Sequence, residues 1–341
     1  MPPRVSIIIL NWNKPDLTIV CYRSCLAQTF ADREILIVDN ASTDDSMARL
    51  TAECPQARLV RNAANEGTGG GFAFGARHAQ GDFFLFLCND TELDPDVLAK
   101  LMEVMDTHPE CGVCGCTHVW HQNPALIELQ GYHVDRFGVQ HGLGSGEPWT
   151  GEDRLIPAWC SGTVLLARRE AYEKAGGYDP QHFTLNDEVD LCWRIRIHGY
   201  RLLIRTGARV RHRHFATLGR EKRARTRYWA ERHLLRTLLK NYCAGTLWRI
   251  LPQYAGLLLM EMIFLAIQGY WSVALADLRA LGWNLRMWPD TRRHRQRIQR
   301  TRTVPDFVFL SECWPGSVKL QWAFGLIRHR QPLYPKAAPP S

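Results

Sequence analysis

Acidic side chains are scarce in the second part of this 341-residue chain. Residues 201–341 hold 7 Asp and Glu against 26 Lys and Arg, whereas residues 1–200 hold 27 against 16. A basic rear part behind an acidic front part indicates that the rear meets an anionic surface, either a membrane or a nucleic acid. Length and composition otherwise fit a globular protein with one large domain and an appendage.

Paired cysteine spacing is also lacking, although the chain has 11 cysteines. Cys111, Cys114 and Cys116 form a C-x2-C-x-C pattern, but no second cluster completes a four-ligand zinc site. The nearby His118 and His121 leave zinc as a weak alternative. We therefore expect buried thiols in a reducing cytoplasm, and the N-terminus shows no signal peptide pattern.

A long uninterrupted apolar run is the third missing feature. The unbroken part of the rear segment, residues 257–267, contains Glu261 and is too short to span a bilayer. Together with residues 271–281 it predicts a helical hairpin that lies in, or dips into, a membrane interface. A basic amphipathic helix over 220–241 and the cationic run 292–302 favour the same contact. A soluble helical subdomain that packs on the front part is the alternative.

The front part alternates between short apolar strands and helical segments. The strands contain β-branched, leucine or aromatic runs, and we expect them at residues 5–10, 34–38, 58–61 and 83–87. Helices are expected between them. This β-α-β-α-β-α-β order predicts an α/β fold with a mostly parallel, Rossmann-like sheet and right-handed crossovers.

The fourth strand ends in the polar turn Cys88-Asn89-Asp90-Thr91, and Asp94-Pro95 is expected to open a helix. Asp90 should then lie at the carboxyl end of a central strand, where open α/β sheets bind ligands. A carboxylate beside Asn89 suits a hard divalent cation that carries phosphates. A turn Asp that caps its own backbone fits the pattern equally well.

A glycine-rich loop, NEGTGGG, covers residues 65–71. It lacks the Gly-Lys-Ser/Thr ending of a P-loop and the glycine spacing of a dinucleotide site. Its glycines permit close backbone approach, and a helix expected from Phe72 would offer its N-terminus to an anion. We expect the loop to face a ligand through Asn65, Gly67 and Gly71, with a flexible turn as the alternative.

A second polar centre lies at residues 187–190, where three carboxylates crowd the start of a predicted helix and the helix dipole stabilises negative charge. A capping box at an ordinary helix would give the same pattern. Further on, residues 200–210 predict two short strands that lead into the basic group 211–214. That group is either a surface cluster or a pair of imidazoles facing one side.

Four blocks of the front part resemble family 2 glycosyltransferases of the GT-A fold. They are VSIIILNWN, ILIVDNASTDDS, RNAANEGTGGGF and LFLCNDTELDPD, in the order and spacing of that family. The chain is most similar to the bacterial rhamnosyltransferase-like and galactofuranosyltransferase-like members, over about residues 4–240. The resemblance implies a GT-A domain over 1–219, followed by a basic, aromatic-rich helical region over 220–341 that associates with a membrane.

The resemblance also implies a donor site and a metal site. The nucleoside would contact Asn11, Asn13, Asp39 and Ser42. The Asp-x-Asp position of the family is Cys88-Asn89-Asp90 here, so Asp90 remains as the strong metal ligand. A histidine after the last strand completes the site; His212 fits that spacing, and His214 lies one strand repeat later. The implied cofactor is Mg²⁺ or Mn²⁺.

The catalytic Glu-Asp pair of the family is reversed here, as Asp187-Glu188. By position Glu188 is the implied general base, and Asp187 is the second candidate. Asp190 matches a position that holds an acceptor hydroxyl. The Ser161-Gly162 block resembles the segment that lies beside the acceptor.

The resemblance thus implies an inverting glycosyltransferase that uses a nucleoside-diphosphate sugar in cell-surface polysaccharide synthesis. The first expectation for the donor is dTDP-rhamnose, and the second is a UDP-sugar such as UDP-galactofuranose. We expect a glycan acceptor that is lipid-linked, an anionic membrane partner, no nucleic acid, and a peripheral or interfacial place on the cytoplasmic face of the plasma membrane. A nucleic-acid-binding protein and an inactive transferase-like scaffold are the alternatives from other classes.

Overall fold

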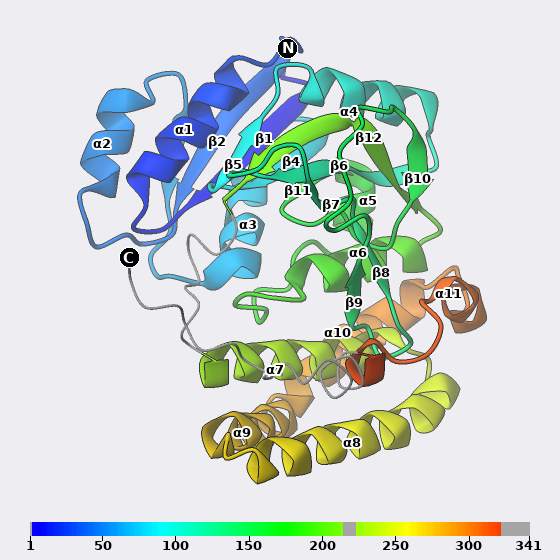
Figure 1. Ribbon diagram of the computed structural model, residues 1–341. Coiled ribbons are helices and arrows are strands. Elements are labelled where there is room, and N and C mark those ends of the chain that lie inside the picture. The colour runs from blue at the N-terminus through cyan, green and yellow to red at the C-terminus, as the bar shows by residue number, and fades with distance from the viewer. Residues whose placement is uncertain (1, 214–222, 322–341) are drawn as a thin grey trace.

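The computed structural model describes residues 2–213 and 223–321, and a ten-stranded sheet forms its centre (Figure 1). One half of the sheet is parallel, in the order β4-β1-β2-β3. Its strands are β1 (Val5–Asn11), β2 (Arg33–Asp39), β3 (Arg58–Arg61) and β4 (Phe83–Cys88). The β-α alternation and the parallel register predicted for this half are confirmed.

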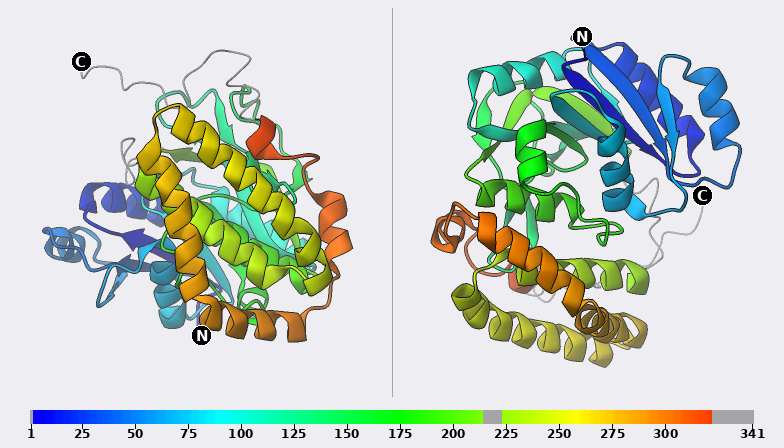
Figure 2. Two further views of the ribbon diagram at one scale, coloured as in Figure 1. Left: turned by 90° about the horizontal axis from the view of Figure 1, so that it is seen from below. Right: turned by 180° about the vertical axis from the view of Figure 1, so that it is seen from behind.

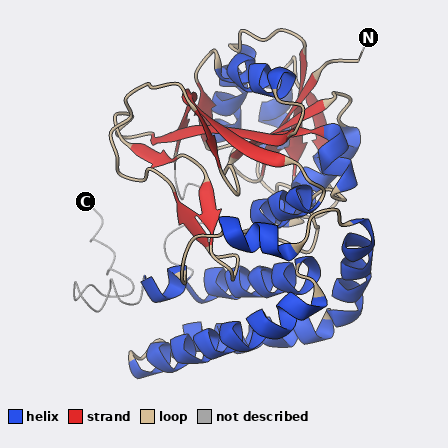
Figure 3. Ribbon diagram, turned by 90° about the vertical axis from the view of Figure 1, so that its right-hand side faces the viewer, coloured by secondary structure: helices blue, strands red, loops and turns tan. Residues whose placement is uncertain are grey.

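The other half of the sheet is mixed. β11 (Val164–Arg168) runs antiparallel between β4 and β6 (Cys111–Trp120), and β12 (Arg201–His212) is parallel to β6. Three short strands extend this half: β5 (Thr91–Leu93), β7 (Ile127–Leu129) and β10 (Leu155–Pro157). A separate hairpin, β8 (Tyr132–Val134) with β9 (Gln140–Gly142), projects from the sheet (Figure 3).

Alternate side chains of the buried strands enter two different cores, as the period of a strand requires. In β1, Ile7 and Ile9 pack with one face of helices, and Ile8 packs with the other. The first face holds α1 (Pro15–Leu26), α2 (Ser46–Glu53) and α4 (Val97–Thr107). The second holds α3 (Gly67–His78), α5 (Arg169–Lys174) and α6 (Asp187–Ile197). Helices on both faces explain why the strands are apolar throughout.

Three predicted boundaries differ in the structure. α3 begins at Gly67, five residues before Phe72, and Gly67 itself has a φ of +71°. Asp94-Pro95 does not open a helix: the chain after Asp90 first pairs with β12 as β5, and α4 starts at Val97. Residues 201–212 form one strand with a register shift rather than two strands.

Five helices form a layer beneath this α/β body (Figures 1 and 3). They are α7 (Arg223–Asn241), α8 (Ala244–Ile267), α9 (Trp271–Arg286), α10 (Trp288–Thr301) and α11 (Asp306–Glu312). α7 lies against the body, and the α8–α9 hairpin forms the side farthest from the sheet (Figure 2). α8 runs through Pro252 without a break and, among the described helices, is long and apolar enough by composition to cross a membrane.

Candidate active site

The carboxyl ends of β1 and β2 carry a buried polar network. Asn11 and Asp39 are register partners, and Asn11 Nδ2 donates to Asp39 Oδ1 at 3.0 Å and to Ser42 Oγ at 3.1 Å. The other end of the Asn11 amide accepts a hydrogen bond of 2.7 Å from Thr18. Asn13, at a φ of 51°, donates its backbone N–H to Ser42 Oγ at 3.0 Å. The structure thus brings together all four residues predicted for the nucleoside.

The glycine loop has a different use from the predicted one. A Cβ on Gly67 would lie 1.8 Å from the carbonyl oxygen of Phe183, and one on Gly71 would lie 2.4 Å from Leu10. The amide of Gly67 bonds to Asn65 Oδ1 at 2.9 Å, and the amide of Thr68 bonds to Phe183 O at 2.6 Å. The glycines therefore allow the protein's own backbone to approach, and these amides of the α3 start are taken by protein oxygens rather than left for an anion.

Asp90 lies in the turn after β4, beside the end of β12. Its Oδ1 is buried, makes no hydrogen bond among the described residues, and lies 3.6 Å from Nε2 of His212. Asn89 is buried next to it and donates to Thr18 at 2.9 Å, which joins this turn to the Asn11 network. His214, the alternative ligand, lies outside the described residues.

Glu128 orients the His212 ring. Nδ1 of His212 lies 2.7 Å from a carboxylate oxygen of Glu128. Since a carboxylate only accepts, Nδ1 carries the proton, and Nε2 turns toward Asp90. Burial by itself lowers the pKa of His212, but the nearby carboxylates of Asp90 and Glu128 outweigh it and raise that pKa to about 9.

The Asp90–His212 pair fits a divalent cation. An orphaned carboxylate oxygen and an imidazole nitrogen face each other, and the second nitrogen of the imidazole is fixed by a carboxylate, as is usual for metal-bound histidine. The neighbouring Cys88 does not add a hard ligand. Burial raises the pKa of its thiol well above the usual range, so the thiol stays neutral.

Asp187 and Glu188 meet the same region from the start of α6. Their charges, together with that of Asp90, act on the Cys88 thiol, which shows how close the two polar centres lie. Asp187 is buried, and burial with the neighbouring charge of Glu188 raises its pKa well above the usual range. Glu188 is half-buried and accepts a hydrogen bond of 2.8 Å from Gln140 of β9.

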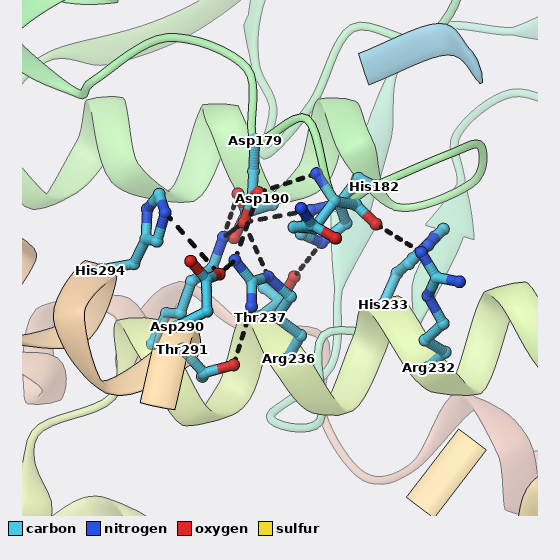
Figure 4. A network of polar contacts seen from close by, with 12 residues as sticks. Asp179, His182, Asp190, Arg232, His233, Arg236, Thr237, Asp290, Thr291 and His294 are labelled. Carbon is cyan, nitrogen blue, oxygen red and sulfur yellow. Dashed lines mark hydrogen bonds and ion pairs between the residues drawn. The ribbon is translucent and has the colours of Figure 1, made fainter. Parts of the chain in front are cut away.

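Asp190 lies apart from these groups, in a buried ion-pair network between α6 and α7 (Figure 4). Its carboxylate is 2.8 Å from Arg194 and 2.9 Å from the ammonium of Lys240. Burial would raise the pKa of Asp190, but these two cations outweigh it and hold the pKa below its usual range. Asp190 thus has cationic partners within the protein, and its role at an acceptor hydroxyl stays a prediction.

Asp179, His182 and Asp190 also lie close enough together to hold a metal ion, since their ligand atoms are within 4.8 Å of one another. Lys240 already occupies that position, because its ammonium bonds to both carboxylates. Arg236 adds a second cation, 2.8 Å from Asp179. We therefore assign this cluster to the ion-pair network and not to a metal site.

The Ser161–Gly162 block lies next to the Cys88 turn. The backbone N–H of Cys88 donates to the carbonyl of Thr163 at 3.2 Å. Ser161 is buried with its hydroxyl unpaired among the described residues, and Gly162 has a φ of +89°. A Cβ on Gly162 would contact Leu129 at 2.8 Å and the His118 ring at 3.4 Å. The block therefore lies between the Asp90 turn and the His118–His212 pair.

Sequence inspection missed Glu128, Gln140 and Thr18, which orient predicted site residues. Glu128 and Gln140 lie in the loop-rich stretch between β6 and β10, where no periodic pattern marks which polar side chains turn inward. Cys111, Cys114 and Cys116 are buried free thiols on β6, as predicted. His118 is buried too, and burial with the charge of His212 lowers its pKa to about 4.

The chain is similar to several known glycosyltransferases in sequence. The family described as "Glycosyl transferase family group 2" matches residues 83–288, and "Glycosyl transferase family 2" matches residues 6–152. The O-antigen biosynthesis protein RfbC of Myxococcus xanthus is 29% identical over 246 residues, 67% of this chain and 18% of that protein. An uncharacterized glycosyltransferase of Nostoc is 33% identical over 182 residues, 52% of this chain and 54% of that protein. The chain thus spans a fifth to half of these two relatives.

A third relative is the N-acetylglucosaminyl-diphospho-decaprenol L-rhamnosyltransferase of Mycobacterium tuberculosis, 28% identical over 218 residues, 55% of this chain and 68% of that enzyme. Among solved structures, GalNAc-T7 with UDP, GalNAc and Mn²⁺ has a TM-score of 0.57 at 17% identity, over 72% of this chain and 49% of that one. The mannosyltransferase PcManGT of Pyrobaculum calidifontis, in complex with GDP-Man and Mn²⁺, has a TM-score of 0.52 at 17% identity, over 88% and 86%.

These structural likenesses show the architecture, a GT-A fold with a mostly parallel central sheet. The family match covers more than half of the chain and carries the assignment further. The chain belongs to the family 2 glycosyltransferases.

Proposed function

We propose that this enzyme transfers a sugar, with inversion, from a nucleoside diphosphate to a hydroxyl of a lipid-linked glycan. The observation that carries the proposal is the facing pair of Asp90 Oδ1 and His212 Nε2, 3.6 Å apart at the ligand-binding edge of the sheet. The nucleoside would lie on the polar network of Asn11, Asp39 and Ser42, at the carboxyl ends of the neighbouring strands.

Asp90 and His212 would hold a divalent metal, Mg²⁺ or Mn²⁺. A cation bound there neutralises charge that develops on the departing diphosphate. The two glycosyltransferase structures named above were obtained with Mn²⁺, which supports this assignment without choosing between the metals. Glu128 would act as a positioning residue through Nδ1 of His212.

Glu188 would be the general base. It would take the proton of an acceptor hydroxyl, while the hydroxyl oxygen forms a bond to the anomeric carbon on the side opposite the diphosphate. The bond from that carbon to the diphosphate oxygen breaks, and its electron pair leaves with the nucleoside diphosphate. Gln140 supports the role, because its hydrogen bond of 2.8 Å fixes one oxygen of Glu188 and leaves the other for a proton.

The surroundings of Asp187 favour Glu188 over Asp187 as the base. Asp187 is buried, and its raised pKa favours the neutral acid, which cannot accept a proton. Glu188 is only half-buried and accepts a hydrogen bond of 2.8 Å from Gln140. Asp187 would instead shape the start of α6.

The relatives support a donor and an acceptor class. One is a rhamnosyltransferase that acts on a decaprenol-linked diphosphate sugar, and another belongs to O-antigen biosynthesis. We propose dTDP-rhamnose as the donor, with UDP-galactofuranose as the second choice, and a lipid-linked glycan of a cell-surface polysaccharide as the acceptor. Such an acceptor would place the enzyme at the cytoplasmic face of the plasma membrane, with Ser161 and Gly162 next to it.

A metal-dependent thermal-shift experiment tests the proposal. The protein is heated with dTDP, UDP or GDP, each with Mg²⁺, with Mn²⁺ or with EDTA, and donor hydrolysis is measured in parallel. We expect one nucleotide to stabilise the protein in the presence of metal, and Asp90→Asn to remove that stabilisation. Stabilisation that is equal with EDTA and in the Asp90 variant would contradict the metal role.

The inactive-scaffold alternative rests on Cys88 and on the reversed Asp187-Glu188 order, and it predicts metal-dependent nucleotide binding without donor turnover.

The ion pairs of the rear part count against the nucleic-acid alternative. Much of the basic charge of the rear part is internal: Arg227, Arg236, Lys240 and Lys319 all form ion pairs within the protein. Binding to nucleic acid that falls steeply with salt, without any nucleotide effect, would favour that alternative.

A further inference from the structure

The α8–α9 hairpin exposes a continuous apolar face. On α8, Leu259, Ile263 and Ile267 recur at helical spacing, and on α9 Trp271, Leu275 and Leu278 do the same. All six are exposed, including 76% of Ile267 and 64% of Trp271. This apolar hairpin face lies on the side away from α7 and the sheet (Figure 2). Monomeric soluble proteins rarely expose so many large apolar side chains together.

Ion pairs hold the opposite side of the hairpin against α7 and Lys319. Glu261 of α8 lies 2.8 Å from both Arg227 of α7 and Lys319, and Asp277 of α9 lies 2.7 Å from Arg227. Tyr254 of α8 adds a hydrogen bond of 2.6 Å to Glu231 of α7. A crossing by α8 would carry Glu261 into the bilayer, or would remove one carboxylate from the ion pairs of Arg227 and Lys319.

Length alone does not decide how α8 meets a membrane. Its 24 residues would measure about 36 Å, enough to cross the hydrocarbon core. Only one side of the helix is apolar and exposed, whereas the other carries the contacts to α7. A helix with this division lies along an interface with its apolar side in the lipid.

The arginines and tryptophans around the apolar hairpin face favour an anionic lipid surface as its partner. On a helical wheel of α9, Arg279 and Arg286 border the stripe of Trp271, Leu275 and Leu278 on one side. Both arginines lie along the same edge of the stripe, beside Leu275; they are exposed and have no ion-pair partner in the described ranges 2–213 and 223–321. Exposed tryptophans stand at both ends of the hairpin sequence, Trp248 and Trp288, as is typical of the headgroup level of a bilayer.

A cavity of about 430 Å³ opens beside the start of α8. Arg136 and Arg249 line it together with Trp314. Neither arginine has an ion-pair partner within the part of the chain that the structure describes. A lipid phosphate next to the face would find two cations there.

We propose that the apolar hairpin face docks on one leaflet of an anionic bilayer, with α8 and α9 parallel to the membrane plane and neither helix crossing it. Side chains such as Ile263 and Leu278 enter the acyl boundary, and Arg279 and Arg286 meet headgroup phosphates. The face is independent of the residues assigned to sugar transfer, so this proposal stands or falls separately from the catalytic one.

Vesicle co-sedimentation tests the surface. The full chain is mixed with vesicles of phosphatidylcholine alone or with phosphatidylglycerol, at low and high salt. We expect binding to the anionic vesicles that weakens with salt. Ile263→Glu with Leu278→Glu should reduce it at least about tenfold, since each puts a charge into the lipid. Each arginine replaced by alanine, at 279 and 286, should cost about fivefold at low salt.

Ala52→Glu is the matched control, because it adds the same charge at an exposed position of α2, outside the hairpin. It should leave vesicle binding unchanged. Circular dichroism and melting temperature of every variant verify folding, and nucleotide-induced stabilisation should be retained in all of them. Absence of wild-type binding to anionic vesicles, or equal binding by the double glutamate variant, would overturn the docking surface.

A protease site inserted at Gly269 distinguishes a hairpin that lies on the membrane from one in which α8 crosses it. Nothing lies within 4 Å of a Cβ built on Gly269, so the turn between α8 and α9 has room for an insert. A hydrophilic insert stays in water on whichever side of the bilayer the turn reaches. We expect protease added outside sealed vesicles to cut it. Protection until the vesicles are lysed would show that α8 crosses the membrane and would overturn the flat orientation.

Discussion

Asp187 and Glu188 are adjacent in the chain, yet their surroundings separate them. Asp187 is buried under the start of α6, whereas Glu188 is half-buried and faces Gln140 on β9. A methylene of extra length brings the Glu188 carboxylate to the hairpin that carries Gln140. The two acids are in reversed order, yet the second residue of the pair, Glu188, is still the one with the more exposed carboxylate.

Glu188→Gln keeps the side-chain shape and removes its proton-accepting charge. Turnover should fall by about 10²- to 10⁴-fold, the usual scale for loss of a general base, while donor affinity should hardly change. Single-turnover rates and nucleotide titration measure the two effects. Asp187→Asn is the matched comparison and should cost less. If Asp187→Asn is the inactive variant and Glu188→Gln is mild, the roles must be exchanged.

Glu128→Gln tests the support of the metal ligand. The amide cannot hold the His212 ring as the carboxylate does, so metal affinity should fall by about 10- to 100-fold. The readout is the Mn²⁺ concentration needed for half-maximal nucleotide stabilisation. Glu92→Gln is the control, because the carboxylate of Glu92 pairs with His121 and Arg213. Equal effects of the two variants would argue against a special role for Glu128.

Between elements, the strongest link is the buried ion-pair network of α6 and α7. Asp179 pairs with Arg236 and Lys240 of α7, and Asp190 shares Lys240. Arg236 also reaches Asp290 of α10 at 2.7 Å. All of these charges except that of Asp290 are buried, so they are stabilised only as a set.

Asp179→Ala leaves two buried cations without their shared partner. The free energy of unfolding should fall by about 3–5 kcal/mol, as for other broken buried pairs. Asp106→Ala breaks the exposed pair with Arg4 and should cost at most about 1 kcal/mol. Urea unfolding of both variants measures the difference. A loss for Asp179→Ala no larger than that for Asp106→Ala would show that the network is solvated in solution.

At the scale of the whole molecule, the rear helices are part of the fold of the front body. Asp290 and Thr291 of α10 bond to Arg236, and Gln299 caps the last carbonyls of α7. Val318 donates to Asp135 in the turn between β8 and β9. The predicted regions 1–219 and 220–341 are thus connected by several buried contacts, and the boundary between them stays a prediction.

Removal of residues 242–341 should consequently destabilise the remaining body. Loss of the α10 partners of Arg236 is expected to cost at least about 3 kcal/mol, which corresponds to a melting temperature lower by about 6–12 °C. Calorimetry of the truncated and full chains measures this. An unchanged melting temperature would show that the body folds independently of the rear helices, as the proposed boundary at 219 implies.

The sequence by itself determined the alternating α/β order, the strand ends that carry Asn11, Asp39 and Asp90, and the burial of most cysteines. These depend on side-chain periods and turn residues that act locally. The direction of β11, the use of Gly67 against Phe183, and the partners of Asp190 and His212 were decided by the tertiary structure. They depend on contacts between residues distant in the chain, and a carboxylate has the same local pattern whether a lysine or a metal faces it.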